Sequence, residues 1–358
     1  MKKVLLTAMA LLTIASASVF GMYGKGDGWI DFLVHGNQFR ARMDRIGFVL
    51  GNDTIKGTFG LYDNEGYLGT ILDSSQTSAE FKPTLSAGIG YTSDVIGVGV
   101  GYNFTYINKN LQVHTPVLMI NALNNNLRIS APIQVAVTDK LNGVTGYKYT
   151  GVAFDNIQLR YYTGIDAFNA IRLYAFYRNN SSDNGVTKQS SEALGFQARF
   201  YFLNTQVGDV TVNPFIRVEY HTALKGGVAA DPNDTYKYTA ENTAVSYISD
   251  TQKQSDIYAA NPFKFAIKPV LSLAANSDFV SLYLEPSIGY ELSGDAPLKV
   301  TGAKQKLTHK LTWGAYGEIY ITPVKDLEWY FEADISGDTV VPVKLAASTG
   351  ITWYLPAL

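Results

Sequence analysis

An unbroken alternation of apolar and polar residues between positions 78 and 92 constrains the fold of this chain more than any other feature. The stretch reads Ser-Ala-Glu-Phe-Lys-Pro-Thr-Leu-Ser-Ala-Gly-Ile-Gly-Tyr-Thr, and every second residue from Ala79 to Tyr91 is apolar. Only an extended chain has a side-chain period of two. The run is longer than a typical strand of about 5–6 residues, but it suits a tilted strand of roughly 9–11 residues that crosses a bilayer. The pattern therefore indicates a membrane-spanning β-strand.

The same alternation recurs as far as the C-terminus, in segments 96–106, 127–138, 194–202, 210–221, 280–290, 307–321, 328–335 and 343–353. Short turns rich in Gly, Asn and Asp alternate with longer polar loops between these segments, which is typical of outer-membrane barrels. We therefore predict an all-β fold: one closed antiparallel transmembrane β-barrel with short periplasmic turns and long extracellular loops. The longest loop would span residues 222–260. A soluble β-sandwich is the alternative, but its outward strand faces would be polar, whereas here the apolar face runs longest.

The expected number of strands follows from the rule that such barrels have an even number of strands. Fifteen strands can be counted between Gln38 and Tyr354, with residues 38–50 taken as the first. Because bacterial single-chain barrels have an even number of strands, Trp29–Val34 is predicted to supply the sixteenth. If Trp29–Val34 forms a helical turn instead, a barrel of 14 strands is favoured.

The N-terminus has the features of a secretory signal peptide. Two lysines precede an apolar run over residues 4–14, which is too short to span about 30 Å as a helix. Cleavage after Ala17 and cleavage after Gly21 both fit the small-residue rule, and we favour Gly21. The predicted domains are a signal peptide over 1–21 and a single barrel over 22–358. The chain has no cysteine, so it can form no disulfide.

Residues that would support catalysis or metal binding are sparse. The chain has four histidines and no cysteine, which leaves little for a zinc site, and it has no G-x-S-x-G nucleophile motif. Glu219 and His221 share an inward face, and we interpret them as a lumen contact. The net charge of −2 argues against nucleic acid. We therefore expect no enzyme, cofactor or metal; the expected partners are outer-membrane lipid, small polar solutes and other copies of the chain.

Three glycines on one predicted strand, Gly97, Gly99 and Gly101, alternate with valines. They superficially resemble a phosphate-binding loop, but they do not open a helix, which phosphate binding of that kind requires. We interpret them as a smooth stretch of inner wall that side chains or an inserted loop approach closely.

Inward-facing charges are the most informative candidates for function. Alternation along each strand places basic residues on the inner face in the first two thirds of the chain, and acidic residues on the inner face in the last third. The candidate pore-lining residues are Arg40, Arg42, Lys82, Arg128, Arg160, Arg199, Arg217, Glu285, Glu318, Glu328, Glu332 and Asp334. Lys56, Arg172, Arg178 and Glu291 share this inward parity but are left out of the set. Facing basic and acidic walls select ions and solutes in water-filled pores, although a salt-bridged lumen without such a role is an equal alternative.

The N-terminal part of the chain is also distinctive as a string. The segments Met22-Tyr23-Gly24, Trp29 to Leu33, His35 to Asp44 and Gly47 to Asn52 resemble the variable surface proteins of the intestinal spirochaete genus Brachyspira. The resemblance implies a surface-exposed outer-membrane protein without catalytic residues, and it carries over no functional site. Sixteen strands, a polar inner face and no recognisable plug domain predict a porin-like passive channel, and the resemblance implies that it is also a variable surface antigen. The alternative is a non-conducting structural surface protein or adhesin that acts through its extracellular loops.

Overall fold

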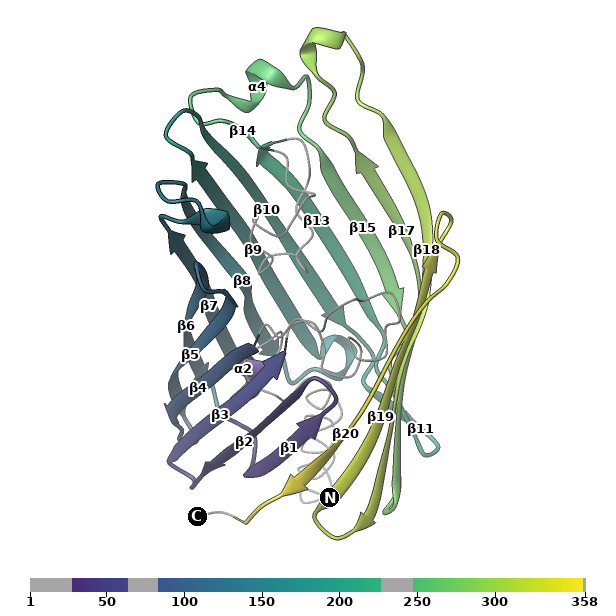
Figure 1. Cartoon of the computed structure of the whole chain (residues 1–358). Coiled ribbons are helices and arrows are strands. Elements are labelled where there is room, and N and C mark those ends of the chain that lie inside the picture. The colour runs from purple at the N-terminus through teal and green to yellow at the C-terminus, as the bar shows by residue number, and fades with distance from the viewer. Residues whose placement is uncertain (1–27, 64–82, 227–246, 357–358) are drawn as a thin grey trace.

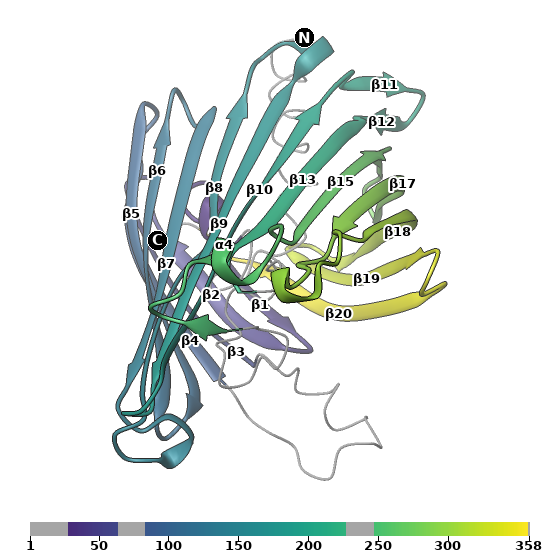
Figure 2. The same cartoon turned by 90° about the horizontal axis from the view of Figure 1, so that it is seen from above.

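The computed structural model of the chain describes residues 28–63, 83–226 and 247–356. Sixteen antiparallel strands form one closed barrel (Figures 1 and 2), as predicted. Each strand pairs with its neighbour along the chain, and β20 pairs with β1, with Gln38 opposite Tyr354. This last pairing closes the sheet and removes both edges, which lipid could not satisfy.

The barrel strands vary in length, from 5 residues in β1 to 18 residues in β18. Their bounds are β1 (Gln38–Arg42), β2 (Arg45–Gly51), β3 (Ile55–Asp63), β4 (Pro83–Tyr91), β5 (Ile96–Asn108), β6 (Leu111–Ala122), β7 (Leu127–Thr138), β8 (Lys148–Tyr162), β9 (Ala170–Asp183), β10 (Lys188–Tyr201), β13 (Phe215–Lys225), β15 (Phe263–Val270), β17 (Val280–Gly294), β18 (Leu307–Val324), β19 (Leu327–Asp338) and β20 (Lys344–Tyr354).

The predicted strand at Trp29–Val34 is wrong, because this segment begins with the helical turn α2 (Gly28–Asp31) inside the barrel. The barrel still has sixteen strands, since residues 38–50 fold back on themselves to give β1 and β2. The turn between them is tight, with Arg42 opposite Arg45. The Asp44 carboxylate contacts the Arg42 guanidinium at 3.1 Å and that of Arg45 at 2.6 Å, and so stabilises the reversal. The expectation that a helical turn here would favour 14 strands is also wrong.

A small extension of the sheet lies at the barrel end that carries the short turns 52–54, 92–95 and 123–126, hereafter the short-turn end. It consists of β11 (Thr205–Val207), β12 (Val210–Val212) and β16 (Leu273–Asn276), and β12 pairs with β16. The segment 210–221, read as one strand in the sequence, is therefore interrupted at Asn213 and Pro214. The first residue of β1 and the last residue of β20 also lie at this end.

The opposite end, hereafter the long-loop end, has an ordered rim. Residues 247–260 of the predicted long loop contain β14 (Ile248–Ser249), which pairs with β10, and the helical turn α4 (Gln254–Ile257). The first residues of that loop, 222–225, lie in β13 instead. Short 3₁₀ turns at Leu141–Gly143 and Lys299–Thr301 also lie at this end, and a third, Asp166–Phe168, lies at the short-turn end. None of the helices in the described ranges is long and apolar enough to cross a membrane.

The two faces of the sheet have the reverse polarity of a soluble protein. On β4, Leu85 and Ile89 face outward with 43% and 58% of their surface exposed, while Thr84 and Ser86 are 0% and 1% exposed on the inner face. Large apolar side chains are likewise exposed on the outer face of the other strands, including Phe48, Val100, Leu118, Phe196, Leu282, Leu311, Phe331 and Ile351. An apolar outer belt around a polar interior is the arrangement of a barrel that sits in lipid.

Candidate functional site in the barrel lumen

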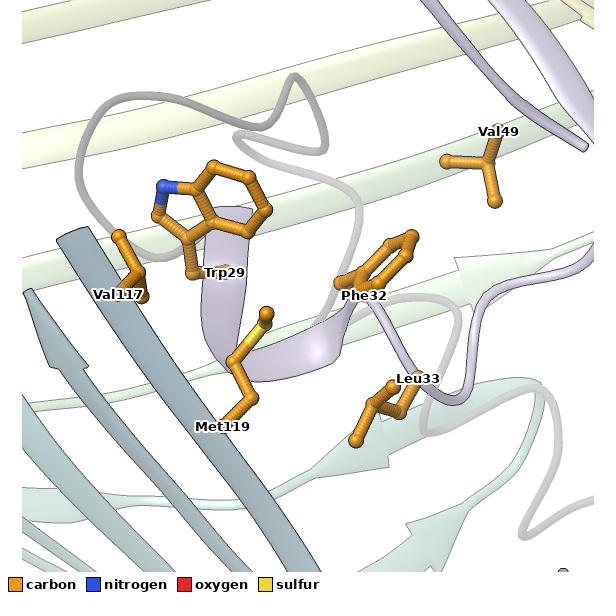
Figure 3. Packing of buried hydrophobic residues seen from close by; sticks show 6 residues of the cluster. All are labelled: Trp29, Phe32, Leu33, Val49, Val117 and Met119. Carbon is orange, nitrogen blue, oxygen red and sulfur yellow. The ribbon is translucent and has the colours of Figure 1, made fainter. Parts of the chain in front are cut away.

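The helical turn α2 and the residues that follow it are packed against the inner wall of the barrel. Trp29, Phe32 and Leu33 are at most 2% exposed and form one apolar cluster with Val49 of β2 and with Val117 and Met119 of β6 (Figure 3). The segment is fastened where it enters β1, because the Asn37 side-chain amide donates to the carbonyl oxygens of Gly51 and Pro356 at 2.8 and 2.7 Å. Part of the lumen is therefore filled by this N-terminal segment.

Glycines on β4 and β5 make room for the inserted segment. A Cβ atom added to Gly101 would lie 2.6 Å from the Trp29 ring, and one added to Gly90 would lie 2.2 Å from a Leu33 methyl group. Gly88, Gly97 and Gly99 are approached by the same side chains within 3.3 Å. This confirms that the glycines of β5 form a smooth inner wall; the inserted element is the chain's own N-terminal segment.

Asp31 joins α2 electrostatically to two arginines of the wall. Its carboxylate oxygens accept hydrogen bonds from Arg128 Nη1 of β7 at 2.7 Å and from Arg160 Nη1 of β8 at 2.8 Å. All three side chains are at most 6% exposed. Burial alone would raise the pKa of Asp31, but the positive charges of Arg160 and Arg128 outweigh it and lower the pKa to about 2. Asp31 is therefore ionised at neutral pH.

Arg128 and Arg160 begin a continuous row of basic residues that face one another across six adjacent strands. The register pairs Arg128 with Arg160, Arg160 with Arg172, Arg172 with Arg199, Arg199 with Arg217, and Arg217 with Lys268. In every case the basic residue is the second or third from the short-turn end of its strand. We call these six residues the basic row.

The alternation of strand faces identified five of the six residues of the row as inward-facing. It did not show that they are neighbours in the barrel. Arg128, Arg160, Arg199 and Arg217 were in the candidate set, Arg172 was left out of it, and Lys268 was missed. The missed signal is positional: from Arg128 to Lys268, each strand that runs to or from a short turn carries a basic residue beside that turn, and the row becomes visible only when these strands are compared.

Aromatic rings pack against the two arginines in the middle of the row, Arg172 and Arg199. The Arg172 guanidinium carbon lies 4.8 Å from the ring centre of Tyr201, and that of Arg199 lies 5.0 Å from the ring centre of Tyr174. The Nε of Arg199 also donates to Gln197 at 2.7 Å. Such cation–π contacts orient a guanidinium without neutralising its charge.

Glu219 contacts the basic row and one histidine. Its carboxylate lies 2.6 Å from Arg217 Nη2 and 3.1 Å from His221 Nε2, and it accepts a hydrogen bond from the Gln197 amide at 3.1 Å. His221 is 1% exposed, and Gly195 on the neighbouring strand leaves space for its ring. The pair is a lumen contact, as expected. Within residues 28–63, 83–226 and 247–356, no three His, Asp or Glu side chains are grouped as a metal site would need.

The acidic candidates lie on the inner face of β17, β18 and β19. Glu318 accepts hydrogen bonds from the hydroxyls of Tyr316 and Tyr320, and Glu285 accepts one from Tyr283. The remaining candidates are placed as follows: Glu332 lies 2.9 Å from Arg42 Nη1, Glu328 accepts from the Tyr354 hydroxyl at 3.3 Å, Arg40 is 9% exposed, and Asp334 is exposed. Lys82 lies outside the described residues.

The inner wall is covered on one side and open on the other. Most inner-face side chains of β6 to β9 are buried, and those of Asn121, Gln158 and Asn180 are at most 1% exposed. By contrast, Glu285 of β17, Lys310 of β18 and Asp334 of β19 are half-buried or exposed on the inner face, although Glu318 of β18 is 2% exposed. Water therefore reaches the interior mainly along the wall that runs from β15 to β19.

Several solved structures align with most of the chain, at low sequence identity and low TM-score. A bacterial polysaccharide outer membrane secretin is 11% identical with a TM-score of 0.44, and the match covers 89% of this chain and 97% of that one. The loop L8 deletion mutant of OmpT, an outer membrane protein of Vibrio cholerae, is 11% identical (TM-score 0.33, 89% and 96% covered). The translocator domain of the autotransporter NalP from Neisseria meningitidis is 10% identical (TM-score 0.28, 99% and 98% covered). No curated protein matches the chain.

The sequence itself matches a family over nearly its whole length. The family described as Serpulina hyodysenteriae variable surface protein aligns with residues 2–354. This range includes the inserted segment, every strand of the barrel and the basic row. The chain therefore belongs to the Serpulina variable surface protein family.

Proposed function

We propose that the protein is a surface-exposed outer-membrane channel that lets small polar solutes diffuse passively, and that its long loops form a variable antigenic surface. The observation that supports the channel best is the charged inner wall from β15 to β19, where several inner-face residues are half-buried or exposed to water. Barrels of about 16 strands enclose an aqueous channel, whereas barrels of about eight are filled by their own side chains. In this proposal α2 and the residues packed with it narrow the channel from one side.

Planar-bilayer recording tests the channel directly. Purified wild-type protein should insert with stepwise increases in conductance. A variant that lacks residues 28–36 should show larger steps, because the apolar cluster around Trp29 would no longer occupy the lumen. If neither protein conducts after heat-modifiable mobility has shown that both are folded, the channel function is excluded.

A specific observation favours the second candidate function, a non-conducting surface protein or adhesin. The inner faces of β6 to β9 are covered, and the rim at the long-loop end is ordered through contacts such as those of Asp250 with Lys188 and Lys225 at 3.1 and 3.3 Å. An ordered rim would present a fixed binding surface outside the cell. Absence of conductance, together with loss of host-surface binding when residues 227–246 are deleted, would support it.

Orientation in the membrane can be tested on intact cells. We propose that the long-loop end faces outward, as in other outer-membrane barrels. Trypsin should then cut after the exposed Lys253 but not after Lys225, whose side chain is 17% exposed and contacts Asp250. Complete protection of Lys253, with cleavage after the exposed Lys325 in the short turn between β18 and β19, would reverse the orientation.

A further inference from the structure

We propose that the open end of the basic row, formed by Arg199, Arg217 and Lys268, is a binding site for small, multiply charged oxyanions such as inorganic phosphate. The proposal refines the channel function, and it rests on that function for transport but not for binding. It names both the place in the lumen and the chemical class of the solute.

The strand register places like charges opposite one another along the row. Five successive cross-strand pairs bring two cations face to face. Side chains in such pairs have Cβ atoms about 4.5–5.5 Å apart, and like charges in this position destabilise a sheet. Anion binding offsets that repulsion, because one oxyanion can contact two neighbouring cations at once.

The chain already uses the row in this way at its other end. The Asp31 carboxylate bridges Arg128 and Arg160, with one oxygen to each guanidinium at 2.7 and 2.8 Å. Asp31 comes from a different part of the chain and reaches the row from the lumen side. The spacing of neighbouring residues in the row therefore suits a single carboxylate-sized anion.

Exposure determines which part of the row an incoming solute can reach. Arg128, Arg160 and Arg172 are at most 6% exposed. The Arg217 side chain is 32% exposed, and Arg199 and Lys268 are half-buried. The accessible residues thus lie on the side of the lumen where water reaches the wall.

The accessible residues also suit an oxyanion chemically. The planar guanidinium offers paired N–H donors that match carboxylate and phosphate oxygens, and the lysine ammonium adds a point charge. Glu219 contacts Arg217 at 2.6 Å and offsets one of the three positive charges. The site keeps a net positive charge, which attracts a doubly charged anion more strongly than a singly charged one.

Binding can be measured on folded protein in detergent by titrating inorganic phosphate in a calorimeter at low salt. Wild type should bind saturably. The double variant Arg217→Gln/Lys268→Gln should bind at least about tenfold more weakly, because it loses charge-assisted hydrogen bonds. The matched control is Lys310→Gln/Lys344→Gln, which removes the same charge from β18 and β20 away from the row and should bind like wild type. No saturable binding by wild type, or equal weakening in both variants, overturns the site.

Bilayer recording in a KCl gradient then distinguishes failure of the proposed anion site from failure of the proposed channel function. Anion-selective conductance that shifts toward cations only in Arg217→Gln/Lys268→Gln supports both proposals. Conductance whose selectivity is equal in all three proteins leaves the channel intact and overturns the role of the row in it. Specific phosphate binding without any conductance keeps the site and overturns the channel.

Discussion

Replacing Asp31 by Asn should weaken the docking of α2 against the barrel wall, and the burial of Asp31 and its two arginine partners determines how large the loss of free energy is. The carboxylate is 3% exposed, and its two partners, Arg128 and Arg160, are 6% and 2% exposed. Removing one member of such a buried ionic group costs about 3–5 kcal/mol, since the remaining charges stay buried without compensation. An exposed ion pair would contribute only about 0–1 kcal/mol.

The apolar side of α2 should limit this effect. Trp29, Phe32 and Leu33 keep their contacts in the Asp31→Asn variant, and full burial of each such side chain is worth about 1.5–3 kcal/mol. We therefore expect a docked segment that opens more often, in a barrel that remains folded.

The absence of cysteine gives a direct assay, because Ile30→Cys introduces the only thiol into the chain, at a site that is 2% exposed. Maleimide labelling of this thiol in detergent reports how often the segment opens. A loss of about 3 kcal/mol should raise the labelling rate about 100-fold, since each 1.4 kcal/mol is tenfold. Asp94→Asn, in an exposed turn, is the control and should leave the rate unchanged. A change below about threefold in Asp31→Asn would show that the ionic contact does not hold α2, and the reasoning would fail.

Three further predictions use the same protein. Gly101→Ala should raise thiol labelling about 5–100-fold, because overpacking against the Trp29 ring costs about 1–3 kcal/mol; Gly57→Ala, whose added Cβ meets nothing closer than 3.9 Å, should not. Burial lowers the pKa of His35 to about 3, below its value of about 6.5 when undocked. Protonation therefore favours the undocked form: docking is strongest above pH of about 6.5, and labelling relative to His35→Gln should rise as the pH falls to about 4.5. On β17, Leu284→Arg on the lipid face should reduce the folded fraction in vesicles, at a cost of up to about 2–4 kcal/mol, whereas Ser287→Arg on the inner face should be tolerated; equal effects would contradict the assigned faces.

The alternation of side chains predicts the fold well because it reports a local property. A period of two assigns each residue to a face, and the structure confirms that assignment on β4 from Thr84 to Ile89. The reversal at Asp44 has no such local signal: the turn contains neither Gly nor Pro, and the ion pairs of Asp44 that stabilise it become visible only once β1 and β2 are paired. The even number of strands was predicted correctly, but the sixteenth strand was assigned to the wrong segment.

The lumen site was less accessible to sequence reasoning, because it depends on register. Parity shows that Arg160 and Arg199 face inward, but it cannot show that they belong to the same level of the barrel. That information comes from the pairing of β8 with β9 and of β9 with β10, which the turns between them fix. The docking of α2 is harder still, since Trp29 and Asp31 contact residues that lie about 20 to 130 positions further along the chain.

The basic row and the inserted segment are best understood as one electrostatic arrangement. A row of like charges is unfavourable. At one end of the row, the Asp31 carboxylate on α2 compensates the charges of Arg128 and Arg160. The helical turn fits there because the glycines of β4 and β5 leave space for it. If relief of repulsion were the only requirement, alternating acidic and basic residues along the row would meet it without an inserted segment. At the other end Arg199 and Lys268 face the water-accessible part of the lumen, beside a carboxylate that contacts Arg217. The asymmetry between an internally occupied end and a solvent-facing end is what a solute-binding wall requires, and a purely structural row would have no need of it.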